Sequence, residues 1–388
     1  MKVSAFIIFI SIVLVVYSLV SYYLFIRGYQ AISGFQFLKI PYIILFFFFT
    51  STYIIARLGE SFLPTSVITF FHFSGSFWLG AIVYFLLLII FFDLIRLANH
   101  FFPFYPKFIL QNYAITRFYL FLFVIAVTAL LLGFGYHNAR NPVVKNLSVN
   151  INKSAGKKAS LKIVCASDIH LGWIIGRNKF SQIVDAILSQ NPDIILLAGD
   201  IVDEDIQPVI NQNLGEDLLR LKVPLGIYAV TGNHEYIGGI EKTTKYLTEH
   251  GITILRDTFI TIENSFHIAG RIDKDAMRFA GRKRKELSDI LNGADKNLPL
   301  ILMDHQPFKL NEAVENGVDL QLSGHTHSGQ LWPGNLITNK IFELSHGYMK
   351  KQNTHFYVSS GVGTWGPPVR IGNKPEIVVI DVRFDGDY

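Results

Sequence analysis

The distribution of apolar residues divides the chain into two parts. In the first third, apolar residues follow one another in long runs, and four of these runs reach the roughly 20 residues that a helix needs to cross a bilayer. The predicted spans cover residues 3–25, 37–56, 77–97 and 114–136. We therefore expect a four-helix transmembrane anchor over residues 1–135, followed by a short linker at 136–140.

From residue 141 onward the apolar runs are short and each ends in polar residues. Apolar and polar residues alternate over 143–151, which predicts an opening strand. Further strands are expected near 161–167, 194–198, 225–230, 298–303 and 318–322, and residues 180–188 have helical spacing. Strands that alternate with helices predict an α/β domain over residues 141–388, with ligands at the carboxyl ends of the strands.

The net charge of +5 lies entirely in the apolar part of the chain. Residues 1–135 contain seven Lys or Arg and two acidic residues, whereas the remainder contains 28 of each sign. Because the excess charge is scattered between apolar runs, it forms no basic patch on a folded surface, and nucleic-acid binding is excluded. The single cysteine, Cys165, excludes a disulfide framework and a multi-cysteine zinc site, and we expect it to be an inert buried thiol.

Ionisable groups within a membrane span are typical of channels and transporters. Here only Asp93 and Arg96 qualify, and their spacing predicts that they pair with each other, so we interpret this part as an anchor. Aromatic residues near the ends of the spans are expected at the membrane interfaces, namely Tyr22, Tyr23, Trp78, Tyr105 and Tyr113.

Charge does not determine the orientation of the anchor, because each side would carry five basic residues. The working assignment is a multi-pass protein of the cell or inner membrane whose catalytic domain faces the cytoplasm. The alternative places that domain outside the cell.

Side chains that can bind metals follow five of the predicted strands. They are Asp168, His170, Asp200, Asn233, His234, His305, His325 and His327. Oxygen and nitrogen ligands without thiolates suit manganese, iron or zinc. Eight residues exceed what one tetrahedral ion needs, but they suit two ions that share a carboxylate. Such a pair can hold a hydroxide and a phosphoryl group for in-line attack.

The order and approximate spacing of these motifs resemble the calcineurin-like metallophosphoesterase superfamily. The motifs are Asp168-x-His170, Gly199-Asp200, Gly232-Asn233-His234-Glu235, His305 and Gly324-His325-x-His327. The resemblance implies a sandwich of two central sheets flanked by helices. It also implies one ion held by Asp168, His170, Asp200 and His327, and a second held by Asp200, Asn233, His305 and His325. In this pattern Asp200 bridges the ions and His234 acts at the phosphate.

Residues 324–333 and 361–370 resemble a membrane-anchored branch with enzymes similar to UDP-2,3-diacylglucosamine pyrophosphatase of lipid A synthesis. The main hypothesis is therefore a membrane-anchored phosphohydrolase with two divalent ions, manganese first and zinc, iron or magnesium as alternatives. Its partners would be membrane lipids and a phosphorylated, lipid-linked substrate. Two alternatives are an exported phosphodiesterase or phosphatase acting on wall polymers or scavenged phosphoesters, and a membrane sensor without turnover.

Several residues have two interpretations each. Arg370 is expected either to contact a substrate phosphate or to pair with Glu376, within a glycine-rich active-site loop at 361–366. Trp173 and its neighbours at 174–175 either form an apolar lip for an acyl chain or belong to the core.

Asp203 and Asp304 are expected to orient ligand imidazoles. The basic run 282–285 is expected to be a solvated helix face, with contact to anionic lipid headgroups as the alternative.

Overall fold

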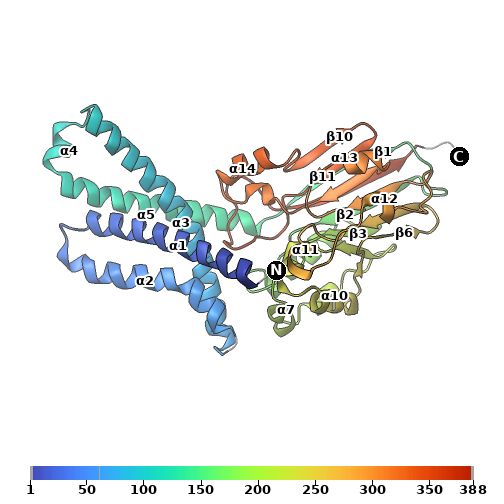
Figure 1. The fold of residues 1–388 in the computed structure, drawn as a ribbon, viewed down its shortest axis with the longest axis horizontal. Coiled ribbons are helices and arrows are strands. Elements are labelled where there is room, and N and C mark those ends of the chain that lie inside the picture. The colour runs from blue at the N-terminus through green and yellow to red at the C-terminus, as the bar shows by residue number, and fades with distance from the viewer. Residues whose placement is uncertain (1–2, 61, 386–388) are drawn as a thin grey trace. The chain divides into compact units, whose positions relative to one another are not determined.

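The computed structural model describes residues 3–60 and 62–385 (Figure 1). The described chain forms two compact units. One holds the helices up to residue 137 and the short segment 366–369, and the other holds the remaining residues. We describe each unit by itself.

The first unit is built from apolar helices. Four are long enough to cross a membrane: α1 (Val3–Ala31), α2 (Gln36–Gly59), α3 (Thr65–Phe101) and α5 (Tyr113–Arg140). A short helix, α4 (Lys107–Gln111), lies between the last two. The four predicted spans are thus confirmed as helices, with longer bounds. The polar residues in 65–76 interrupt the apolar run without breaking the helix, and α5 continues through residues 136–140, where a linker was expected.

Two details of this unit differ from the sequence-based predictions. Asp93 pairs with Arg27 of α1, at 2.5 Å between Oδ2 and Nη2, and not with Arg96 one turn away. Trp78 was expected at an interface, but its ring packs inside the unit against Phe46 and Phe49, at centroid distances of 5.4 and 5.8 Å. Sequence spacing along one helix could not reveal either partner, because both lie on other helices.

The second unit contains two six-stranded sheets. The first has the order β1 (Val143–Ile151), β12 (Glu376–Phe384), β2 (Ser160–Ala166), β3 (Ile194–Ala198), β4 (Ile227–Val230) and β5 (Thr253–Ile254). The second has the order β10 (Gly347–Lys351), β11 (Thr354–Val358), β9 (Leu320–Ser323), β8 (Leu300–Met303), β7 (Phe266–Gly270) and β6 (Thr258–Ile262). Both are mixed sheets, because parallel and antiparallel pairs occur in each.

The alternation of side chains along β2 shows how the layers are built. Ile163 and Cys165 join a buried cluster that draws residues from both sheets, including Ile268 and Leu322. Val164 faces the other side, where a second cluster holds the apolar face of α6 (Arg177–Leu188). The sheets therefore pack face to face with helices outside. This arrangement confirms the predicted fold class and the burial of Cys165.

Shorter helices connect and cover the strands. They are α7 (Gln207–Asn211), α8 (Gly215–Leu218), α9 (Asn233–Gly238), α10 (Ile240–Glu249), α11 (Ala276–Ala280), α12 (Leu287–Ile290), α13 (Asn311–Glu315), α14 (Gly334–Ile341) and the 3-10 helix η1 (His327–Gly329). The basic run 282–285 lies between α11 and α12 and is not helical, so the predicted helix face was wrong.

Strand direction gathers the candidate site residues. β2, β3 and β4 are parallel neighbours, so their carboxyl ends lie at one edge of the first sheet. β8 and β9 are parallel neighbours in the second sheet. The five loops that follow these strands carry all eight candidate residues.

Candidate metal centre

The loops that carry the candidate residues have unusual backbone conformations. Asp168, His170, Asp200, His325 and His327 all adopt the left-handed region, with φ between 49° and 71°. Non-glycine residues rarely adopt this region, and such strain concentrates at functional sites. The loops are therefore shaped to aim these five side chains at the cost of local stability.

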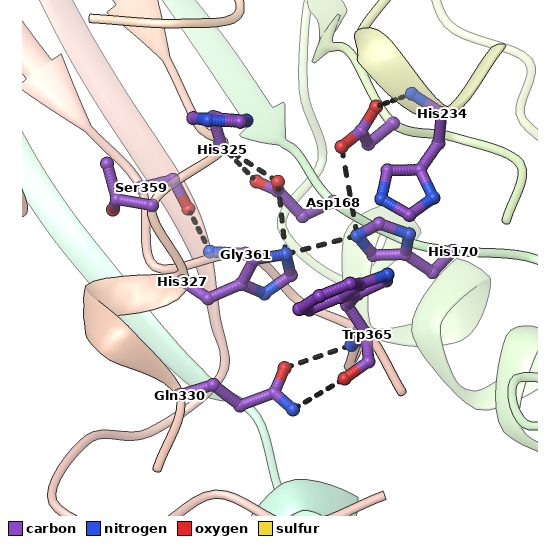
Figure 2. A network of polar contacts seen from close by, with 12 residues as sticks. Asp168, His170, His234, His325, His327, Gln330, Ser359, Gly361 and Trp365 are labelled. Carbon is purple, nitrogen blue, oxygen red and sulfur yellow. Dashed lines mark hydrogen bonds and ion pairs between the residues drawn. The ribbon is translucent and has the colours of Figure 1, made fainter. Parts of the chain in front are cut away.

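One group of side chains forms around His170 and His327. Their Nε2 atoms lie 3.1 Å apart, and Nε2 of His327 lies 3.4 Å from Oδ1 of Asp168 (Figure 2). All three side chains are buried. The backbone N–H of His325 donates to Asp168, which ties this group to the next.

A second group forms around Asp200, His305 and His325, whose potential ligand atoms lie within 4.8 Å of one another. Oδ2 of Asp200 is 3.1 Å from Nε2 of His305 and 3.9 Å from Nε2 of His170. Nδ1 of His325 is 2.9 Å from Oδ1 of Asn233. Asp200 thus lies between the two groups.

The chemistry of the two groups fits divalent cations. Buried nitrogen and oxygen lone pairs that converge on one another are unfavourable unless a cation lies between them. A metal also requires unprotonated imidazoles. Burial and the neighbouring charge of His305 lower the pKa of His325 to about 3, and burial with the Arg370 charge lowers the pKa of His327 well below its usual value. Burial opposes ionisation of Asp200, but His305 and His234 hold its pKa well below the usual range.

His234 lies beside these groups and pairs with Asp203. Its Nδ1 is 3.1 Å from Oδ1 of Asp203, and Nδ1 of His170 is 3.5 Å from the same oxygen. Burial lowers the pKa of His234, but Asp200 and Asp203 outweigh burial and raise it to about 9. At neutral pH His234 is therefore an imidazolium that can donate to an anionic oxygen. Asp203 contacts both imidazoles, as expected.

Asp304 has a different role from the one predicted. Its carboxylate pairs with Arg284 and lies 3.6 Å from Nη1 of Arg271. It therefore neutralises arginines at the rear of the β8 loop and orients no imidazole among the described contacts.

Glu235 supports the site and was given no role in the sequence analysis. Its buried carboxylate accepts N–H groups from Gly232 at 2.7 Å, Val202 at 2.9 Å and Asp200 at 3.2 Å. This one side chain joins the loops after β3 and β4. A signal was present, because a Glu three residues after a helix N-cap can accept the N–H of the N-cap residue, as Glu235 does from Gly232.

Arg370 is fully buried and does not pair with Glu376 among the described contacts, while its expected contact with a substrate phosphate stays a prediction. Its guanidinium donates to the carbonyls of His327 at 2.9 Å and Gly363 at 2.6 Å. Glu376 instead accepts the backbone N–H of Ser360 at 3.0 Å. The arginine therefore fastens the glycine-rich loop to the loop of His327. A Cβ at Gly363 would lie 2.0 Å from the carbonyl oxygen of Ile169. Only glycine at position 363 therefore lets this loop pass so close to the segment of Asp168.

Two aromatic residues lie at different places near the site. Trp173 is half-buried, whereas its neighbours at 174–175 pack against the core, so the lip interpretation applies to Trp173 alone. Trp365, which the sequence analysis did not single out, is 52% exposed and its ring centroid lies 6.0 Å from that of His234. The side chain of Gln330 holds the backbone of Trp365 by two hydrogen bonds of 2.7 and 2.9 Å (Figure 2).

Asp273 is a further buried carboxyl near the site with no sequence signal. It accepts Nε2–H of Gln306, at 2.9 and 3.1 Å to its two oxygens, and Gln306 follows His305 directly. Burial raises the pKa of Asp273 to about 7.

Comparison with known proteins agrees with this geometry. The model of the calcineurin-like phosphoesterase family matches residues 161–329, which include all eight candidate residues. An uncharacterized metallophosphoesterase of Aquifex aeolicus is 35% identical over 233 residues, covering 60% of this chain and 88% of that protein. The chain belongs to the calcineurin-like metallophosphoesterase family. It is therefore a metal-dependent hydrolase of phosphoester bonds.

Other similar proteins extend this picture of the metallophosphoesterase. A transmembrane protein with metallophosphoesterase domain from Danio rerio is 32% identical over 270 residues, covering 66% of this chain and 61% of that protein. A solved structure, a 5'-nucleotidase precursor from Thermus thermophilus, has 12% identity and a TM-score of 0.37, covering 58% of this chain and 54% of the other. Together with the four apolar helices, the Danio relative supports a membrane protein.

Proposed function

We propose that this metallophosphoesterase binds two divalent ions and hydrolyses a phosphoester or pyrophosphate bond in a lipid-linked substrate. The main support for two ions is the position of Asp200 between two groups of nitrogen and oxygen donors. Asp168, His170 and His327 would complete one ion site, and Asn233, His305 and His325 the other. Bound ions would supply an activated water and charge stabilisation at the phosphoryl oxygens. Manganese is our first choice of ion.

Two side chains outside the ion sites also have roles in the proposed reaction. We assign His234 the role of general acid, because its imidazolium is the charged donor beside the ligand groups and Asp203 fixes its ring. Arg370 is a positioning residue in this scheme, since both of its terminal nitrogens donate to backbone carbonyls.

Support for a lipid-linked substrate comes from the surface of α14. Leu336, Ile337 and Ile341 are 61%, 62% and 57% exposed, and α14 has no buried residue. Exposed apolar patches on a folded unit are typical of membrane or ligand contact. The helix adjoins the site at both ends: it follows η1, which begins with His327, and the ring of Phe342 after it lies 6.1 Å from that of His325. An acyl chain could rest on this surface while its phosphate reaches the donors.

The names of the relatives specify no substrate, so the proposal extends only to a class. UDP-2,3-diacylglucosamine is the first compound to test. A water-soluble aryl phosphodiester provides the comparison without an acyl chain. The full chain is assayed in bilayer discs with manganese, magnesium and zinc in turn. We expect hydrolysis of both substrates and loss of both activities in Asp200→Asn. Full activity of Asp200→Asn would overturn the metal mechanism.

The α14 surface is tested separately by the double variant Leu336→Ser and Ile337→Ser. Burial of one such side chain is worth roughly 1.5–3 kcal/mol, so we expect at least about a tenfold loss on the lipid substrate. The soluble diester should be cleaved at the normal rate. Leu219→Ser is the matched control, since Leu219 is an exposed leucine on α8's C-terminal side. Equal rates on both substrates in all variants would favour a soluble phosphoester and the exported alternative.

We also propose that the catalytic unit faces the cytoplasm. Its cysteine is buried and free, which is compatible with a reducing compartment. Reporter fusions after residue 388 test this directly, and signal from a reporter that is active only outside the cytoplasm would overturn it.

A further inference from the structure

A partly open apolar cavity lies among the membrane helices. It has a volume of about 450 Å³ and is lined by α1, α2, α3 and α5, with Leu45, Phe85 and Ile125 among the lining residues. Its volume lies within the range of ligand pockets, about 300–1,000 Å³. No charged side chain lines it among the described residues. An occupant must therefore be hydrocarbon.

A second cavity of about 280 Å³ adjoins the first. The two share Gly28, Ile89, Phe121 and Val124 in their walls. The lining of the second is largely apolar too, but it includes the charged side chains of Arg27, Asp93, Arg96 and Arg117, and we call it the polar part of the space. These four residues come from the end of α1, the end of α3 and the start of α5, which meet at one end of the helices. The combined space is thus apolar in one part and charged in the other.

The charges of the polar part do not cancel. Asp93 is already paired through one oxygen, because Arg27 lies 2.5 Å from its Oδ2 and Tyr23 donates its hydroxyl to the same oxygen at 2.6 Å. Arg117 donates to Ser33 Oγ at 3.1 Å, while its Nε is buried with no hydrogen-bond partner among the described residues. Neither Arg96 nor Arg117 has an ion pair within the described chain. Three arginines and one aspartate leave an excess of two positive charges.

Uncompensated charge is unfavourable near the hydrocarbon core, and ionisable residues there mark functional sites. We propose that this space binds an anionic phospholipid, with its phosphate at Arg96 and Arg117 and an acyl chain in the apolar cavity. A neutral lipid would leave the arginines without a counter-charge, and a free anion would leave the apolar cavity empty. Tyr105 and Tyr113 also line the polar cavity, and tyrosine is typical of headgroup depth. The inference does not depend on the metal reaction.

The test uses the full chain in detergent, loaded with phosphatidylglycerol or phosphatidylcholine and examined by native mass spectrometry. We expect phosphatidylglycerol to be retained and phosphatidylcholine to be lost on dilution. Arg96→Gln and Arg117→Gln should each weaken phosphatidylglycerol binding about fivefold, since a basic residue near lipid headgroups contributes about 1 kcal/mol. Val124→Phe, at the junction of the cavities, should reduce binding by filling the space for the chain.

Matched controls exclude general effects. Lys107→Gln removes one charge at the same end of the helices but outside the cavity, and Leu130→Phe adds an aromatic ring on the exposed side of α5. Both should bind lipid normally. An unchanged circular-dichroism spectrum and melting temperature show that each variant is folded. Unchanged retention in all three cavity variants, or equal retention of phosphatidylcholine, would overturn the proposal. Displacement by glycerol 3-phosphate alone would also overturn it, because the ligand would then be a free phosphate.

Discussion

At the residue scale, the protonated ring of His234 should matter only for substrates whose leaving group needs a proton. Below its pKa of about 9 the ring is an imidazolium held by Asp203. A poor leaving group, such as an alkoxide, requires a proton, whereas 4-nitrophenolate departs without one. We therefore expect His234→Asn to lower kcat about 10²- to 10⁴-fold for an alkyl ester and much less for the nitrophenyl ester.

The measurement is kcat for both esters across pH 6–10. The wild type should lose alkyl esterase activity as pH rises through about 9, and the variant should lack this decline. His250→Asn removes a histidine outside the site and should leave both rates unchanged. An equal loss on both esters in His234→Asn would contradict the general-acid role.

A second residue-scale prediction concerns pH and Asp273. Burial raises its pKa from 3.8 to about 7. The folded state therefore keeps a proton that the unfolded state releases, and the free energy of unfolding falls as pH rises from about 4 to about 7. Asp273→Asn, which stays neutral, should escape this loss. Its melting temperature relative to wild type, measured in chelator, should rise between pH 5 and pH 8. A difference that is constant with pH would contradict this, and the exposed Asp289→Asn serves as control.

Sequence alone predicted more about the ligand groups than about their surroundings. Asp168, His170 and His327 could be found because residue type and position after a strand are both visible in sequence. The pairing of Arg370 with Glu376 was wrong because the arginine's partners are mainly backbone carbonyls, which no residue pattern specifies. Asp273 lies at a strand end too, but a single carboxyl in a loop carries no motif.

At the scale of elements, Glu235 links the start of α9 to the end of β3. Its two carboxylate oxygens accept three N–H groups, including that of Asp200. Glu235→Gln keeps only one acceptor oxygen, so a buried N–H loses its partner at a cost of about 1–3 kcal/mol. We expect a lower melting temperature and weaker manganese binding, since the Asp200 loop is loosened.

Thermal melting and metal titration check this prediction. The control is Glu249→Gln at the exposed end of α10, which should change neither quantity. Normal metal affinity in a destabilised Glu235→Gln would show that the carboxylate supports the fold without positioning Asp200.

The elements themselves were predictable where periodicity was strong. The four membrane helices and the strands before each motif were predicted because apolar runs define both. The bounds were less predictable: α3 begins at Thr65 because helix formation tolerates the polar residues that end a hydropathy window. The strands after residue 340 could not be ordered, since their pairing depends on contacts distant in sequence.

At the scale of the whole molecule, ion binding should couple to stability. Ions held by the six ligands of the two groups, five of which are buried, would bind only the folded state. A metal concentration about 100-fold above the dissociation constant adds roughly 2.7 kcal/mol to the free energy of unfolding. Chelation should therefore abolish hydrolysis and lower the melting temperature of the catalytic unit by roughly 5–10 °C, and manganese should restore both. The melting temperature of Asp200→Asn should respond much less; an equal response would contradict shared ligation by Asp200.

The division into two units was visible in the charge and hydropathy of the sequence, but the internal contacts of the membrane unit were not. The pairing of Asp93 with Arg27 depends on how α1 and α3 pack. The same packing creates the cavities on which the lipid proposal rests.

The position of β12 has a consequence for biosynthesis. It is the last strand in the described sequence, yet it is hydrogen-bonded between β1 and β2, with Val143 opposite Glu376. At about 5–20 residues per second, β1 leaves the ribosome on the order of 10–50 s before its partner strand. Throughout that interval β1 and β2 lack the strand that joins them, and unpaired strand edges promote aggregation. The nascent catalytic unit therefore exposes unpaired strand edges during this interval, while the helices before it can already enter the membrane.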